Sequence, residues 1–376
     1  MEKSETGQDF HISAMLKFMN RTNIDQADRP TRLPVDNIRL TLMILLFIIG
    51  TPINVMAFVR IRRSMQCVKT QLKLLKLHLN ISDLMVMLIY TGSQIVWLIT
   101  VEWRSSNAFC KTLKFLHALC FSISSNVIVC IALHRFTSIF SPSAQLTKIT
   151  LTLAWILAII TSIPQFATWT VYQPKDTASW HQCVSVWFAK EHQLYMQNYT
   201  DFQNIIVTST AYSIYHVLTV FWIPACLIII CYGGLSILVS RRMFCECERL
   251  NTQLSLSQHR TVSTSLSNAN SSKRLLSRLI PLSPTGNSKS CEKHQLSHHC
   301  IIVRRKRNAV RTCLLLIITY VACWLPYNIF FLWGLIDEHH YHKWNSTVIT
   351  FLNYLIVANS VINPFIYLPI RKTMLC

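Results

Sequence analysis

The side chain whose chemistry stands out most in this sequence is a carboxylate in an apolar setting. Asp83 is the only acidic residue deep inside any of the long apolar runs of the chain. A charged group at such a position is costly in a membrane, so it indicates a function. No run combines a nucleophile with a base, the arrangement that covalent catalysis needs, and the sequence therefore predicts no enzyme.

A second group with possible chemistry lies in a polar segment further along the chain. Its potential metal ligands are Cys291, His294, His298, His299 and Cys300. Their spacing could bind zinc. A polar loop without packed surroundings holds a metal poorly, however, so we expect no resident zinc here.

Seven long apolar runs must position these side chains. They cover residues 38–60, 74–98, 110–140, 149–172, 205–239, 307–336 and 346–370. Each is close to the ~20 apolar residues that an α-helix needs to cross ~30 Å of hydrocarbon. Only helices and closed barrels satisfy their backbone groups in lipid, and barrel strands would alternate over ~10 residues. The sequence predicts an all-α membrane protein, a seven-transmembrane helix bundle.

The distribution of positive charge predicts the orientation in the membrane. The formal net charge is +20, which in a soluble protein would suggest nucleic-acid binding. Here the excess of Lys and Arg follows the first run, lies between the fifth and sixth runs, and follows the seventh. The positive-inside rule puts these segments in the cytoplasm and the N-terminus outside. We expect a multi-pass plasma-membrane protein whose basic clusters contact lipid headgroups, with no nucleic-acid partner.

The runs also divide the chain into segments. We expect an extracellular N-terminus (1–37), helices one to five (38–240), a disordered third cytoplasmic loop (241–304), helices six and seven (305–370) and a short cytoplasmic tail (371–376). The loop is rich in Ser, Asn, Lys and Arg, so it buries too little apolar surface to offset its conformational entropy. Glycosylation sequons on the predicted outer face lie at Asn20, Asn198 and Asn345.

Two cysteines fall on the predicted outer face, where the environment is oxidising. Cys110 opens the third run and Cys183 lies in the second outer loop. A bridge between them would tie that loop over the mouth of the bundle.

Motifs along the seven runs resemble the rhodopsin-like (class A) G-protein-coupled receptors over residues 38–370, apart from the third inner loop. They are Asn54, Leu79, Asp83, Cys110, Arg135, Trp155, Pro224, Tyr232, Cys323-Trp324-Leu325-Pro326-Tyr327 and Asn363-Pro364-Phe365-Ile366-Tyr367, in the order of the family. The resemblance implies a partner, the heterotrimeric G protein, which couples through Arg135 and Tyr232, with the Gq class as the candidate.

The resemblance also implies an activation network around Asp83. Its other members would be Ser124, Trp324, Asn359, Ser360, Asn363 and Tyr367. Together these groups could hold an allosteric sodium ion through hard oxygen ligands, and no other cofactor is expected. The alternative is a buried hydrogen-bond network without an ion.

Further details resemble the receptor group for gonadotropin-releasing hormone, adipokinetic hormone and vasopressin/oxytocin. They are Leu77-His78-Leu79-Asn80-Ile81-Ser82-Asp83, Ser162-Ile163-Pro164-Gln165 and Gln182-Cys183-Val184. The positions that align with polar pocket residues of that group are Gln94, Lys114, His117 and Gln165, with Tyr327, Asn328 and Phe331 completing the wall. The resemblance implies a short peptide ligand, whose donors and acceptors these side chains match. Each could instead be a helix-end residue that faces headgroups or water.

The sequence departs from the family where an acid usually precedes the Arg, because His134 stands there, followed by Arg135 and Phe136. A poorly coupling decoy receptor is therefore one alternative, and a vasopressin/oxytocin-like peptide receptor is another. A transporter would show paired repeats and broken helices, and an opsin would have a Lys in 346–370; the sequence has neither.

Overall fold

A computed structural model describes residues 34–140, 143–173, 180–197, 203–238, 288–336 and 338–368. In the helix that begins at Ser288, side chains are described from Arg311 onward. The sequons at Asn20 and Asn198 lie outside the described residues. The same holds for the side chains of Asn345 and of the potential metal ligands named above between Cys291 and Cys300.

The first half of the described chain forms four membrane-length helical segments. They are α2 (Pro34–Cys67), the continuous series α3 (Gln71–Met85), η1 (Val86–Thr91) and α4 (Gly92–Thr100), then α5 (Asn107–Thr137), and α6 (Ala144–Ser162) followed by the short α7 (Gln165–Thr168). Side-chain oxygens begin three of these segments: Thr70, Ser106 and Ser143 each accept a hydrogen bond from the backbone N–H three residues later. Such N-caps satisfy donors that a helix leaves unpaired at its first turn.

The second half supplies three further long helices. They are α9 (Gln203–Val217) with η2 (Leu218–Trp222) and the helical residues 223–238, then α11 (Ser288–Ile336) and α12 (Glu338–Tyr367). Among the described residues, six helices are long and apolar enough to cross a membrane, and Phe351–Tyr367 is a shorter apolar helix. This arrangement confirms the predicted all-α seven-helix bundle.

The contacts divide the chain into two compact units. The first contains residues 1–229 and 312–376, and the second contains residues 230–311. Every predicted site residue with a described side chain belongs to the first unit except Tyr232, which lies in the second.

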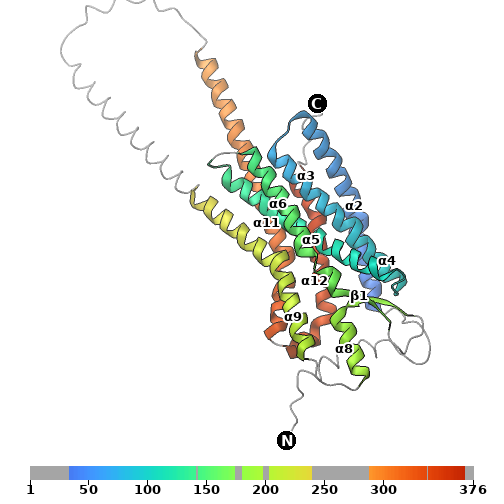
Figure 1. Cartoon of the computed structure of the whole chain (residues 1–376). Coiled ribbons are helices and arrows are strands. Elements are labelled where there is room, and N and C mark those ends of the chain that lie inside the picture. The colour runs from blue at the N-terminus through green and yellow to red at the C-terminus, as the bar shows by residue number, and fades with distance from the viewer. Residues whose placement is uncertain are drawn as a thin grey trace, which may run out of the picture. The chain divides into compact units, whose positions relative to one another are not determined.

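Helix α5 is the most deeply packed span of the first unit. In its most apolar stretch 72% of the residues are buried, against 22% to 33% in the other spans. It packs against α3 and α6, and Figure 1 shows these helices side by side. A core cluster of Val86, Met87, Cys120, Val357 and Val361 joins α5 to η1 and α12. Residues on α5 are therefore placed to contact several other helices at once.

A β-hairpin and a short helix follow α7. Strand β1 (Trp169–Tyr172) pairs antiparallel with β2 (Gln182–Ser185), and α8 (Val186–Met196) comes next. The fourth apolar run was expected to be helical to residue 172, but the helix is interrupted after Ser162, resumes as α7 over Gln165–Thr168, and gives way to strand β1 at Trp169. Pro164 cannot continue the hydrogen-bond pattern of a helix, and Trp169, Val171 and Tyr172 favour a strand.

The predicted disorder of 241–304 is wrong for its last part, because α11 is helical from Ser288. Between Gly286 and Pro326 the sequence contains no Gly or Pro, so nothing there stops a helix. Extending an existing helix adds one hydrogen bond for each residue fixed, which is far easier than starting a new one. The low apolar content of this segment did not reveal that the helix predicted from residue 305 begins as early as Ser288.

Candidate functional site

A cavity of about 370 Å³ lies among the helices next to the β1–β2 hairpin. The residues that line it come from η1 and α4, α5, α7, β1, α9 and η2, α11 and α12. All seven side chains predicted to contact a ligand are among them: Gln94, Lys114, His117, Gln165, Tyr327, Asn328 and Phe331. The fold thus brings together residues that are far apart in the sequence around one space.

The Lys114 ammonium lies between two indole rings in this cavity. Its Nζ is 3.8 Å from the centre of the Trp169 ring and 4.8 Å from that of Trp97. Such cation–π contacts stabilise a positive charge without neutralising it. No carboxylate pairs with Lys114 within the described ranges. Its N–H groups can therefore donate a hydrogen bond to an oxygen atom of a bound molecule.

Three other predicted residues are held by hydrogen bonds. The His117 Nε2 lies 2.8 Å from the Ser93 Oγ, and the Trp169 Nε1 donates to the Gln165 Oε1 at 2.6 Å. The Asn328 Nδ2 donates to the Trp324 carbonyl at 2.9 Å, but the Asn328 Oδ1 is buried with no partner among the described residues. A buried acceptor without a donor is costly, so a ligand N–H at this atom would be favourable.

Sequence reasoning missed several residues that line the cavity: Tyr90, Phe121, Trp169, Tyr212, His216 and Asn353. Helical spacing could have found some of them. Lys114, His117, Ala118 and Phe121 follow the i, i+3, i+4, i+7 pattern of one helix face. Trp169 lies on a strand that the sequence predicted as helix, so no periodicity indicated it.

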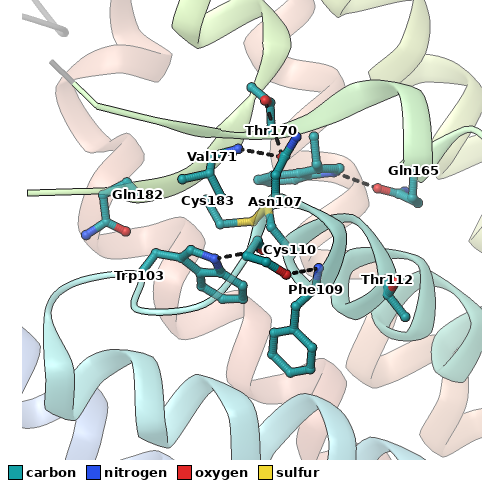
Figure 2. Close-up of a disulfide and its surroundings, with 12 residues drawn as sticks. Trp103, Asn107, Phe109, Cys110, Thr112, Gln165, Thr170, Val171, Gln182 and Cys183 are labelled. Atoms are coloured by element: carbon teal, nitrogen blue, oxygen red, sulfur yellow. Dashed lines mark hydrogen bonds between the residues drawn. A yellow bond between two sulfur atoms is a disulfide. The ribbon is translucent and has the colours of Figure 1, made fainter.

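The hairpin beside the cavity is anchored to the first turn of α5. Figure 2 shows the disulfide between Cys110 of α5 and Cys183 of β2, whose Cα atoms are 5.8 Å apart. The bridge predicted from the sequence is therefore confirmed. On the neighbouring strand, the backbone N–H of Val171 donates to the Asn107 Oδ1 at 3.0 Å. Both strands are thus tied to α5.

The predicted network around Asp83 forms a buried polar core between helices. The Asn363 Nδ2 donates to both oxygens of Asp83, at 3.0 and 3.2 Å. The Asn80 Nδ2 donates to the Asn54 Oδ1 and to the Tyr367 hydroxyl, each at 2.9 Å. These bonds join α2, α3 and α12 through groups that lipid could not satisfy.

The remaining members of the network are buried but are less fully paired. The Asn54 Nδ2 donates to the Ser360 backbone carbonyl at 3.0 Å, and the Ser124 side chain is buried. The Trp324 Nε1, the Asn359 Oδ1 and the Asn363 Oδ1 are buried without a hydrogen-bond partner in the part of the chain that the structure describes. Oxygens of this kind beside a buried carboxylate fit a hard cation such as sodium.

Arg135 lies at the other end of α5 from the cavity and contacts sulfur rather than a carboxylate. Its Nε donates to the Cys313 Sγ at 3.1 Å, and its Nη2 is buried with no partner among the described residues. The neighbouring His134 has its Nδ1 3.2 Å from the Thr147 Oγ1. Because that hydroxyl donates to the Ser143 carbonyl, it accepts from His134, whose Nδ1 then carries the proton.

Comparison with known proteins gives the class of protein that this fold and site define. Residues 53–367 match the family described as "7 transmembrane receptor (rhodopsin family)". The chain belongs to this family, so it is a G-protein-coupled receptor and not an enzyme.

The chain is also similar in sequence to individual receptors. The chain is 31% identical over 373 residues to the "G-protein coupled receptor daf-38" of Caenorhabditis elegans, with 88% of each chain covered. It is 27% identical to the "Gonadotropin-releasing hormone receptor" of Octopus vulgaris, covering 93% of this chain and 76% of the relative. It is 23% identical to the "Vasopressin V1b receptor" of Mus musculus, covering 82% and 66%.

The disulfide leads to a prediction that tests whether Cys110 and Cys183 act as one bonded pair or independently of each other. Removal of a native bridge from an oxidised region typically costs ~2–5 kcal/mol, and here it would also release the hairpin from α5. We expect Cys110→Ser and Cys183→Ser each to lower surface expression, measured by flow cytometry of an epitope-tagged receptor. The double variant should be little worse than either single one, since both remove the same bond. Additive losses would contradict a shared bridge.

Proposed function

We propose that this receptor binds a short peptide hormone of the gonadotropin-releasing-hormone or adipokinetic-hormone kind. It would lie in the plasma membrane with its N-terminus outside and signal through heterotrimeric G proteins of the Gq class. The observation that carries the proposal is the cavity, where Lys114 has no acidic partner among the described residues and the Asn328 Oδ1 has no donor.

A peptide is the ligand class that these side chains fit best. Peptide amide groups offer both N–H donors and carbonyl acceptors, and the cavity contains side-chain acceptors for the former and donors for the latter. Gln94, Gln165 and Asn328 can accept and donate through their side-chain amides, while Lys114 can only donate. Aromatic walls from Tyr90, Phe121, Trp169 and Tyr327 give the apolar area that a peptide side chain would bury.

Relatives support a hormone of this kind without deciding between two groups. The octopus relative is named for gonadotropin-releasing hormone and the mouse relative for vasopressin. A vasopressin/oxytocin-like peptide is therefore the second candidate. A decoy receptor is the third, because Arg135 contacts Cys313 and the usual neighbouring acid is replaced by His134.

One screen distinguishes these candidates. Cells that express the chain are exposed to a neuropeptide library containing gonadotropin-releasing-hormone-like, adipokinetic-hormone-like and vasopressin/oxytocin-like peptides, with calcium and cyclic AMP as readouts. A calcium response to a peptide of the first two groups is expected. A response only to the third group would favour the second candidate. Binding of a labelled peptide with no response from any G protein would favour the decoy.

The cavity residues should control the potency of the peptide that the screen identifies. Ala variants of Gln94, Lys114 and Gln165 would each leave a desolvated peptide group unpaired, which costs ~1–3 kcal/mol, on the order of tenfold or more in potency. Surface expression should barely change. Gln193, an exposed residue of α8 that does not line the cavity, provides a matched control, since Gln193→Ala should leave potency as it is. Normal potency in all three cavity variants would rule out this binding mode.

We further propose that the polar core binds sodium as an allosteric ion. Asp83 would hold it together with the amide oxygens of Asn359 and Asn363, which have no donor among the described residues, and with the buried hydroxyls of Ser124 and Ser360. A bound cation would offset the cost of a carboxylate in the middle of the bundle and would favour the packing of helices that surrounds it.

The sodium proposal predicts an ion-dependent stability that needs no agonist. An ion that binds the folded state at ~100 times its Kd stabilises that state by ~2.7 kcal/mol. The purified receptor should therefore unfold at a higher temperature in sodium chloride than in N-methyl-D-glucamine chloride at equal ionic strength. Asp83→Asn keeps the shape of the side chain but removes its charge, so the difference should vanish. If the wild type unfolds at the same temperature in both salts, the core is a hydrogen-bond network without an ion.

A further inference from the structure

The residue that follows α4 has a backbone conformation that its side chain disfavours. Val101 has φ 56°, in the left-handed region, which is rare for a β-branched residue. Its carbonyl accepts two hydrogen bonds from side chains of the second outer loop, from the Gln182 Nε2 at 2.7 Å and from the Trp180 Nε1 at 3.1 Å. A conformation of this kind persists only where its surroundings hold it, and it is typical of functional sites.

The same glutamine also fixes an indole ring. The Gln182 Oε1 accepts a hydrogen bond from the Trp97 Nε1 at 2.8 Å, so both ends of the Gln182 amide are used. An indole N–H is the single polar group of a Trp side chain and can only donate. Rotation of Trp97 away from its place would therefore break its bond to Gln182.

The ring that Gln182 holds is one of the two that enclose Lys114. The ammonium contacts both Trp97 and Trp169. The Trp169 Nε1 donates to the Gln165 Oε1. Each indole is thus oriented by one glutamine. Gln165 lines the cavity and belongs to the binding site already described, whereas Gln182 does not line it.

We infer that Gln182 is a positioning residue that sets the place of Lys114 in the cavity through Trp97. This inference rests on the proposed function, since it explains how the cavity presents its one ammonium to an oxygen of the ligand. The Val101 carbonyl fixes Gln182, Gln182 fixes Trp97, and Trp97 with Trp169 fixes the ammonium. Ligand specificity then depends on the second outer loop, through a residue that touches no ligand.

The test measures the surroundings of Lys114 directly and needs no ligand. The full chain is labelled with lysine carrying ¹³C at Cε and purified in detergent, and the Lys114 signal is assigned by its loss in Lys114→Arg. In the wild type, the ring currents of two indoles should displace this signal upfield from those of exposed lysines. Gln182→Met keeps the length of the side chain but removes both hydrogen bonds, so the Lys114 signal should move toward the exposed position.

Two further variants keep the test decisive. Trp97→Phe retains an aromatic ring but removes the N–H that Gln182 binds, and it should also move the signal even if Gln182→Met folds poorly. Gln193→Met places the same substitution on the exposed face of α8 and should leave the signal unmoved. A Lys114 signal that stays in place in a folded Gln182→Met receptor would overturn the inference. Failure of the peptide screen would leave this result intact, so the two proposals can fail separately.

Discussion

The pairing of Asp83 with Asn363 is the interaction on which the rest of the bundle depends. A carboxylate inside a membrane protein must have polar partners, because lipid offers none. Asn363 supplies donors to both oxygens of Asp83, and the neighbouring bonds among Asn54, Asn80 and Tyr367 extend the contact to a third helix. The first, second and seventh spans are therefore joined by groups that are stable only while those helices stay together.

Trp324, a predicted member of the same network, belongs to a chain of aromatic contacts that begins at the cavity. Phe121, which lines the cavity, meets the Trp324 ring edge to face at 5.7 Å, and Trp324 in turn contacts Tyr320 at 5.8 Å. The Tyr320 hydroxyl donates to the Val220 carbonyl in η2 at 3.4 Å. About two turns before Tyr320 along α11, Cys313 accepts from Arg135. Ring contacts and a stretch of one helix therefore link the cavity to Arg135 within a single unit, which is the physical requirement for coupling the two ends.

The sequence was sufficient to predict the parts of this arrangement that depend on the membrane. Long apolar runs predict helices, and a lone acid such as Asp83 predicts a polar core, because lipid leaves few alternatives. The pocket residues Lys114 and Asn328 were found through likeness to a receptor group, and the structure places them around one cavity. Their role in binding remains a proposal.

Other features could not be predicted because they depend on contacts between distant segments. Strand β1 follows Pro164 inside an apolar run, and its partner β2, which contains Cys183, begins ten residues after β1 ends. The contact between Arg135 and Cys313 joins residues that are 178 positions apart, and no periodicity indicates it. The helical start of α11 at Ser288 depends on its continuity with a membrane span rather than on its own composition.

The proposed function requires this receptor to activate G proteins, and we propose that it does so through Arg135, which among the described residues bonds to a thiol and not to a carboxylate. A thiol sulfur is a weak acceptor and carries no negative charge, so it holds the Arg135 cation less strongly than a carboxylate would, and the inactive arrangement should be held weakly. The most direct test is G-protein activation without added ligand, at matched surface expression, in the wild type and in His134→Asp. The account predicts measurable activity in the wild type and several-fold less when the adjacent carboxylate is supplied. A silent wild type whose activity His134→Asp leaves unchanged or raises would contradict it.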